Sequence, residues 1–187
     1  MGLDMYLSAE RYVSGWDHEN AEEKEKFSKV LEIVEGQQVP TDDCPSLTVS
    51  VNCAYWRKAN AIHRWFVENV QDGQDDCKSY YVSREQLQEL KALCEKVLSE
   101  LETQEGDICT GVTYQSGKPP LKSWKEGTVV SNKSVAKKHL PTQDGFFFGG
   151  TDYDEGYITD LRDTVEQLER VLKIVDRRWS FHYQSSW

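Results

Sequence analysis

The chain has 187 residues, enough for one domain with a buried core, and a net charge of −10 at neutral pH. That charge argues against a general nucleic-acid-binding protein, because contacts to phosphates need a cationic surface. The longest apolar run is too short for a membrane span, and the opening residues show neither a basic region nor a cleavage site. We therefore expect a soluble, cytoplasmic protein that does not bind membranes.

Cysteine and lysine differ in how they are distributed along the chain. The five cysteines are scattered and contain no Cys-x-x-Cys pair, which predicts reduced thiols rather than disulfides or structural zinc. Between Thr110 and His139 six lysines stand against the single acid Glu126, so this stretch carries +5 and the remainder −15. An acidic body with one basic insert is therefore expected.

The first half of the chain alternates predicted strands and helices. Alternating apolar residues predict strands over 2–13 and 47–53. A helix is predicted over 21–35, with Asn20 as N-cap, Glu23 completing a capping box and Gly36 at its end. Apolar spacing predicts a second helix over 55–70, directly after the second strand.

The second half is less regular. A short strand is predicted over 80–82, and Ser83 with Gln86 predicts a capped helix that runs to about residue 101. Residues 103–140 lack a sustained period of apolar residues, which predicts a basic, loop-rich excursion from the domain. A hairpin between 111–114 and 127–130 is one alternative. A buried strand over 145–149, a long helix capped by Asp152 and a strand over 179–187 complete the series.

Four helices and four or five short strands in mixed order predict an α+β fold. We expect a single domain over 1–187, with a small mixed or antiparallel sheet, helices packed on one side of it, and the excursion at about 103–140. The long helix has a spacing close to a heptad seam. Its packing within one chain or across two stays open, so a homo-oligomer is a candidate state.

The segment 55–66 is the most informative for function. It combines four aromatic residues with polar side chains at Arg57, Asn60, His63 and Arg64. On one helix, Trp56, Asn60 and His63 would share a face, and Arg57 and Arg64 the neighbouring face. Aromatic rings beside such hydrogen-bond donors predict a pocket for a planar anion. The alternative is that the aromatics are core, the arginines are solvated and His63 is a partly buried, internally bonded histidine.

We expect the 145–150 strand and the closing strand to complete this pocket. Rings of Trp56, Trp65 or Phe147 would stack on the ligand, basic side chains would pair with phosphate, and Asn60 and His63 would bind polar edges. The predicted ligand-binding residues are Trp56, Arg57, Lys58, Asn60, His63, Arg64, Phe147, Tyr183, Gln184 and Trp187.

No motif predicts a reaction. Gly149, Gly150 and Thr151 stand at a predicted helix start, where a phosphate could bind, but the acids that follow would repel it. Those acids, with a histidine, could hold a divalent metal, although no His-x-His or His-Glu-x-x-His motif is present. We therefore predict no catalytic residue, no metal ligand and no cofactor.

Four short segments of the chain resemble segments of known proteins. They are Met1–Leu7 (MGLDMYL), Tyr55–His63 (YWRKANAIH), Leu140–Gly149 (LPTQDGFFFG) and Tyr183–Trp187 (YQSSW). In this order they resemble a group of small accessory proteins encoded by tailed bacteriophages and prophages, across nearly the whole chain. The resemblance implies a bacterial host cytoplasm and a non-structural role, and carries over no catalytic residue.

Three functions follow as hypotheses. The first is a phage-encoded, non-enzymatic binding protein that sequesters a small anionic, nucleotide-like ligand to counter host defence. The alternative is a protein–protein inhibitor of a host factor, which would dock through the acidic surface or the Lys118–Lys138 insert. The second alternative is a metal-dependent nucleotide or phosphoester hydrolase that uses Asp152, Asp154, Glu155 and His63.

Overall fold

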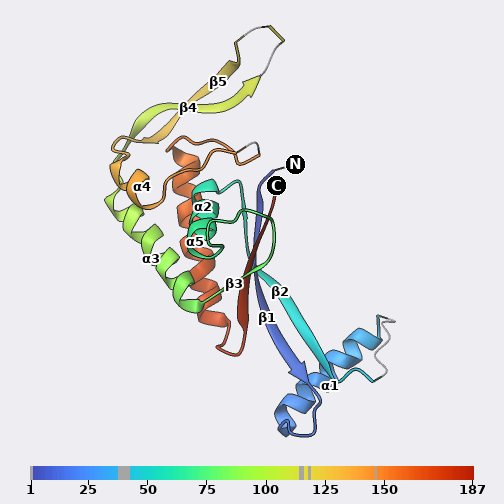
Figure 1. The fold of residues 1–187 in the computed structure, drawn as a ribbon. Coiled ribbons are helices and arrows are strands. Elements are labelled where there is room, and N and C mark those ends of the chain that lie inside the picture. The colour runs from blue at the N-terminus through green and yellow to red at the C-terminus, as the bar shows by residue number, and fades with distance from the viewer. Residues whose placement is uncertain (1, 38–42, 114–115, 118, 146) are drawn as a thin grey trace.

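A four-stranded antiparallel sheet, in the order β2-β1-β6-β3, forms the centre of the fold (Figure 1). The computed structural model describes residues 2–37, 43–113, 116–117, 119–145 and 147–187. The strands are β1 (Asp4–Ser14), β2 (Ser46–Arg57), β3 (Tyr80–Val82) and β6 (Ser180–Ser186). All pairings within this sheet are antiparallel, so the α+β prediction is confirmed and the antiparallel alternative is the right one.

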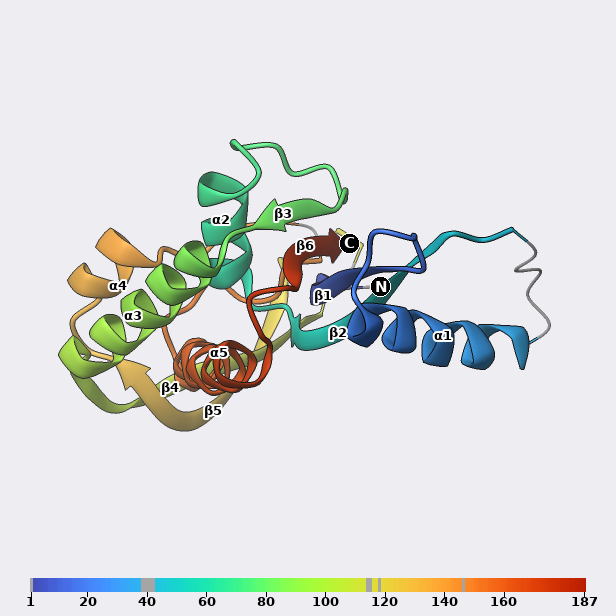
Figure 2. The same cartoon turned by 90° about the horizontal axis from the view of Figure 1, so that it is seen from below.

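Helices cover one face of the sheet. The two long helices, α3 (Arg84–Glu100) and α5 (Glu155–Ile174), lie side by side (Figure 2). The short helix α2 (Asn60–Asn69) follows β2 directly, and α4 (Ser134–His139) packs against α3. The remaining helix, α1 (Ala21–Glu35), lies at the end of the β1–β2 pair where Ser14 pairs with Ser46 (Figure 1).

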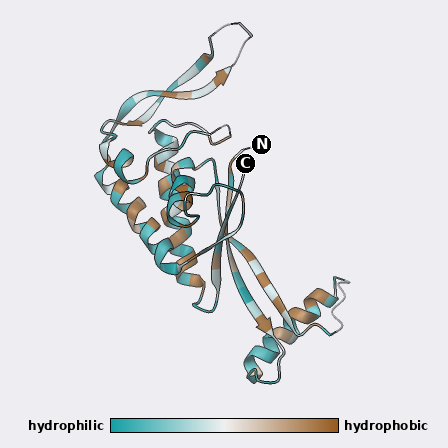
Figure 3. Cartoon of the chain, in the orientation of Figure 1, coloured by the Kyte–Doolittle hydropathy of each residue, from teal (hydrophilic) through white to brown (hydrophobic). Residues whose placement is uncertain are grey.

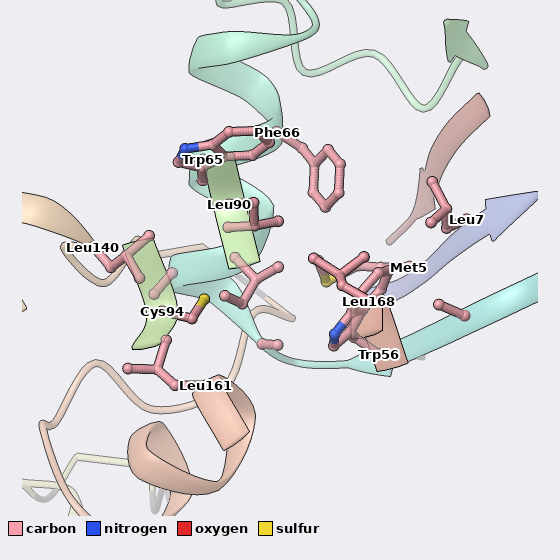
Figure 4. Packing of buried hydrophobic residues seen from close by; sticks show 14 of the residues in the cluster. Met5, Leu7, Trp56, Trp65, Phe66, Leu90, Cys94, Leu140, Leu161 and Leu168 are labelled. Atoms are coloured by element: carbon pink, nitrogen blue, oxygen red, sulfur yellow. The ribbon is translucent and has the colours of Figure 1, made fainter. Parts of the chain in front are cut away.

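The core lies between this sheet face and the long helices (Figure 4). Alternation along β1 turns Met5 and Leu7 inward, where they meet leucines at helical spacing on α3 and α5, as predicted for those helices. Both helices therefore show a hydrophobic and a hydrophilic side (Figure 3). The buried helix residues include Leu87, Leu90, Cys94, Val97, Leu161, Thr164 and Leu168.

The opposite face of the sheet carries side chains that are half-buried or exposed. Tyr6 lies across from Tyr55 on one neighbouring strand and from Gln184 on the other. Tyr81 lies across from His182, and its side chain is 62% exposed. In the part of the chain that the structure describes, no helix is packed over these residues.

A two-stranded hairpin projects from the body beyond the ends of α4 and α5 (Figure 1). It consists of β4 (Thr103–Thr113) and β5 (Leu121–Val130), and we call it the arm. Its base is joined to the body because Val130 N donates to Tyr153 O over 2.9 Å. The segment predicted to be rich in loops at 103–140 is a long hairpin and a helix. The alternative of a hairpin is therefore right, but residues 111–113 pair with 121–123 and not with 127–130.

Several local predictions are wrong. The helix predicted from residue 55 begins at Asn60, because β2 continues through Arg57. The described residues of 145–149 form a turn and no strand. The last helix is capped by Asp154 rather than Asp152. Gly36 ends α1 as predicted, with a right-handed backbone of φ −59°.

Candidate functional site

The turn between β2 and α2 separates residues that we expected on one helix. Lys58 has a left-handed backbone, with φ 60°, and its N–H donates to Leu3 O over 2.8 Å. Upstream of this turn, alternation along β2 directs Trp56 into the core and leaves Arg57 exposed. Trp56 and Arg57 therefore share no helical face with Asn60, His63 or Arg64, and the predicted helical pocket is wrong.

The Asn60 side chain holds the loop that precedes α5. Its Nδ2 donates to Phe148 O over 3.1 Å and to Gly150 O over 2.7 Å, while Oδ1 accepts from Gln143 N over 3.1 Å. The side chain is buried, so water cannot replace these bonds. Both amide hydrogens are used within the protein, and Asn60 acts as a clamp on residues 143–150.

The His63 side chain is fully buried between two side-chain partners. Its Nδ1 lies 2.7 Å from the Tyr183 hydroxyl and its Nε2 lies 3.0 Å from Asp75 Oδ2. Burial lowers the pKa of His63, an effect that Asp75 opposes. Burial also raises the pKa of Tyr183, whose ring stacks on Phe66 at 3.9 Å. His63 is an internally bonded histidine, as the alternative interpretation held, and its partners are side chains.

The other expected ligand residues are dispersed. Trp56 Nε1 donates to Thr164 Oγ1 inside the core, and Arg64 pairs with Glu68 on the surface of α2. Gln184 donates to Cys77 O, and Trp187 Nε1 donates to Asp75. The structure does not bring these side chains into one pocket with Arg57 and Lys58.

Arg57, Lys58 and Phe147 do line open space. A cleft of about 790 Å³ lies between the arm and the loop over 144–152, and we call it the arm cleft. Lys58 and Phe147 belong to it, together with Val112 and Lys122 from the arm. It adjoins an inner pocket of about 280 Å³, and the two share Lys58, Cys109, Gly149, Gly150 and Asp152. The inner pocket is also lined by Arg57, Asn60, Asp154, Gly156, Tyr157 and Asp160.

Gly149 is the residue that lets the loop approach the β2–α2 turn. Its φ is 90°, and a Cβ atom at this position would lie 3.1 Å from the Lys58 Cβ atom. A larger residue would be strained by the backbone and crowded by Lys58. The surface shared by the cleft and the inner pocket is therefore formed by close contact of the Gly149 backbone with Lys58.

The inner pocket has mixed charge. Arg57 and Lys58 face acids of α5 and its preceding turn, and burial, with repulsion from Asp163 and Asp154, raises the pKa of Asp160 to about 7. Asp154 Oδ1 accepts from the Gly156 and Tyr157 amides. The N-terminus of α5 is thus already capped by a carboxylate, which leaves the predicted phosphate position at Gly149–Thr151 without free helix amides.

The hydrolase alternative depends on a set of metal ligands. Across residues 2–187, apart from the short gaps that the structure does not describe, no three His, Cys, Asp or Glu side chains are grouped to hold a metal ion. Asp152 and Asp154 line the inner pocket, whereas His63 is buried between Tyr183 and Asp75. The four residues named for the hydrolase therefore do not form a ligand set.

Val112, Lys122 and Asp160 are among the cavity residues that sequence reasoning did not assign to a binding site. A signal for Asp160 was present, because it lies three residues after Tyr157 and four before Thr164, on the edge of the apolar stripe of α5. A carboxylate at such a position is unusual unless it is paired or faces a cavity. Val112 and Lys122 could not be assigned before the arm was known to be a hairpin.

Within the described residues, no helix combines the length and apolar character needed to cross a membrane. Comparison of the chain with protein-family models, with curated proteins and with solved structures gives no match in any of the three.

Proposed function

We propose that this chain is a non-enzymatic binding protein that holds a segment of a partner protein in the arm cleft. One observation carries the proposal: Val112 and Trp124 are large apolar side chains on one face of the arm, and they are 41% and 55% exposed. Apolar side chains concentrated on a projecting hairpin favour association, because contact with a partner removes them from water.

One face of the arm has the composition of a binding surface. Val112 lies directly across from Lys122, and Trp124 follows on the same face of β5. The Lys122 ammonium lies 5.7 Å from the centre of the Trp124 ring. A tryptophan beside an aliphatic residue and a cation is typical of the energetic centre of protein interfaces.

The shape of the cleft favours an extended segment over a small molecule. Val112 and Lys122 form one wall, and Asp144, Phe147 and the exposed Gly150 form the other. The cleft is large and open to solvent on one side, whereas sites for small ligands usually enclose most of the ligand surface. A peptide fits these walls when it has an acidic residue to pair with Lys122 and an apolar residue to pack against Val112 and Phe147.

The phage resemblance supports a host protein as the partner. Small accessory proteins of phages often act by sequestering a nucleotide signal or by covering a host protein, and the acidic surface or the basic segment Lys118–Lys138 was expected to dock on such a protein. Lys122 and Lys125 of that segment lie on β5, and Lys118 lies outside the described residues. A partner with an acidic, apolar surface is therefore the form of the proposal that we favour.

The test uses the intact chain as bait in bacterial lysate, followed by calorimetry with the purified partner. Trp124→Ala and Lys122→Glu should each weaken binding by tenfold or more, since each removes about 1.4 kcal/mol or more of interface energy. Trp16→Ala is the matched control, because Trp16 is a tryptophan of similar exposure, 45%, away from the arm. Equal loss in the control, or unchanged binding by both arm variants, would contradict the proposal.

A second candidate is capture of a small anionic ligand in the inner pocket. The observation that favours it is the pair of adjacent cations, Arg57 and Lys58, beside the main chain of Gly149 and Gly150. Acids at 152, 154 and 160 line the same pocket and oppose an anion, which is why we place this function second.

Titration calorimetry with nucleoside mono-, di- and triphosphates tests the second candidate. Binding should be lost in Arg57→Ala and retained in Arg64→Ala, whose side chain pairs with Glu68 outside the pocket. Absence of heat with every nucleotide would remove this candidate and leave the arm proposal unaffected.

A further inference from the structure

The two edges of the four-stranded sheet differ in length. β3 has three residues, whereas β2 has twelve. An edge strand presents unpaired N–H and C=O groups, which proteins protect by short strands, charged side chains, proline or bulges. β3 is protected because it is short. The longer strand β2 needs charged side chains, proline or a bulge for the same protection.

Most of β2 lacks these devices. From Ser46 to Tyr55 the strand has no charged residue and no proline. A bulge at Cys53, and the bond from Tyr55 N to Gln167 Oε1 over 2.8 Å, protect only its second half. In the described structure, the main chain of Leu47–Asn52 makes hydrogen bonds only to β1. Six uncharged residues therefore present an open edge.

An apolar groove lies beside this edge, on the helix-covered face of the sheet. Its volume is about 230 Å³, and it is lined by Ala9, Val51, Cys53, Ile174, Val175 and Trp179. Val51 is 49% exposed and Ile174 is 72% exposed. On α1, at the other end of the same strand pair, Ile33 is 68% exposed. Apolar surface is thus left uncovered along the open edge.

The charges on either side of the groove are opposite in sign. The stretch Arg170–Arg178, at the end of α5, has four basic residues and one acid. Helix α1 has five glutamates and three lysines, and two of the glutamates, Glu22 and Glu23, already pair with Arg178 within the chain. If two copies pair antiparallel through β2, the strand directions reverse, and α1 of one copy comes beside the end of α5 of the other. The acidic helix then faces the basic one, with Ile33 near the groove.

We infer that two copies of this chain associate through Leu47–Asn52 of β2, antiparallel about a two-fold axis. The two four-stranded sheets become one continuous sheet, with β2 and its counterpart at the centre. Main-chain hydrogen bonds supply pairing, and the apolar groove and the charges of α1 and α5 supply the specificity. A strand without charge suits this pairing, because identical charged residues would face one another across the axis.

This association does not use the arm. The arm and its cleft lie at the opposite end of α5 from the groove (Figure 1). Both arms of a dimer therefore stay free for partners, and the inference stands whether or not the proposed function is right.

Sedimentation equilibrium of the intact chain over a hundredfold concentration range tests the inference. We expect twice the chain mass at the upper end of the range and dissociation on dilution. Val51→Lys places an ammonium group on the edge and in the groove, and should give the mass of one chain throughout. Tyr81→Lys, on the protected edge at β3, should leave the dimer unchanged. Circular dichroism checks that both variants are folded.

Hydrogen exchange gives a second, independent readout. Amides within Leu47–Asn52 should exchange more slowly in the dimer, and should lose this protection on dilution and in Val51→Lys. A wild-type chain that is monomeric at every concentration overturns the inference. So does a dimer that persists in Val51→Lys, or one that leaves exchange over Leu47–Asn52 unchanged.

Discussion

His63 Nδ1 lies 2.7 Å from the hydroxyl of Tyr183, and this contact joins α2 to the middle of the sheet. Both side chains are fully buried. On its other side His63 meets Asp75, which also accepts a bond from Trp187 Nε1 over 3.0 Å. The arrangement ties α2, the turn after it and β6 into one buried polar network, whose integrity depends on the protonation of His63.

Acid should destabilise the fold through His63. Its folded-state pKa is lowered, mainly by burial, from a normal value of 6.5. Between these two pKa values the unfolded chain binds more protons than the folded one, so the free energy of unfolding falls as the pH drops below about 6.5. Urea unfolding at a series of pH values measures this slope.

The control for this prediction is His63→Phe. The variant lacks the titrating group, so its unfolding free energy should vary less between about pH 7 and pH 5 than that of the wild type. Its absolute stability will also fall, because Tyr183 and Asp75 lose a partner. Equal slopes in both proteins would show that another group causes the acid sensitivity.

Asn60→Ala should loosen the loop that forms the cleft wall. The substitution removes three hydrogen bonds at a buried position, which corresponds to about 3 kcal/mol of unfolding free energy. Faster hydrogen exchange at Gln143, whose amide loses its acceptor, should accompany the loss. Asn69→Ala, at an exposed asparagine with one bond to Trp65 O, should cost less than about 1 kcal/mol. Similar costs at both sites would contradict the clamp role.

Asp160→Asn should stabilise the protein above neutral pH. The folded-state pKa of Asp160 is about 7, raised mainly by burial, while the unfolded carboxyl has its ordinary value of 3.8. Between these values the folded state binds more protons, so ionisation of Asp160 reduces stability as the pH rises. The gain from the asparagine should be larger at about pH 8 than at about pH 4. A pH-independent gain would indicate that charge at residue 160 is not its cause.

Thr164→Val should expose the dependence of Trp56 on its buried partner. Trp56 Nε1 donates to Thr164 Oγ1 over 2.9 Å, and valine preserves the side-chain shape while removing the acceptor. An unsatisfied buried donor costs about 1–3 kcal/mol. Thr103→Val, at an exposed threonine, should change the unfolding free energy by less than about 0.5 kcal/mol. A stable Thr164→Val protein would mean that the indole finds another acceptor.

Elements with local capping chemistry were predictable. Ser83 and Gln86 form the reciprocal capping box that the sequence suggested, and α3 runs from Arg84 to Glu100 with its apolar stripe buried. Such signals work because the interacting groups lie within one turn of each other. The N-cap at Asn20 was predicted for the same reason and is confirmed. The capping box predicted with it is wrong, because the Glu23 side chain pairs with Arg11 and Lys26 instead.

The boundary between β2 and α2 was not predictable from local pattern. Residues 54–57 suit a strand as well as a helix, and the strand ends where Lys58 adopts a left-handed backbone. Glycine or asparagine would have marked such a turn, but lysine carries no such signal. The boundary was therefore placed too early, and Trp56 and Arg57 were assigned to a helical face.

The roles of the predicted site residues depend on contacts with residues that are distant in the sequence. Asn60 bonds to Gln143, and His63 bonds to Tyr183, across 83 and 120 residues. A sequence shows which side chains can form hydrogen bonds, but only the fold decides whether a partner or a ligand takes them. Arg57 and Lys58 remained at a cavity because the strand and the turn direct them away from the core.

The central position of β6 has a consequence for folding during synthesis. A nascent chain contains β1 and β2 early, and these pair with each other across α1, but β3 has no neighbour in the sheet until residues 180–186 emerge from the ribosome. Helices α3 and α5 can pair before that point, against a half-built sheet. Emergence of Ser180–Ser186 from the ribosome therefore completes the layer, and a ribosome stalled earlier would leave an apolar sheet face and β3 exposed to chaperones and proteases.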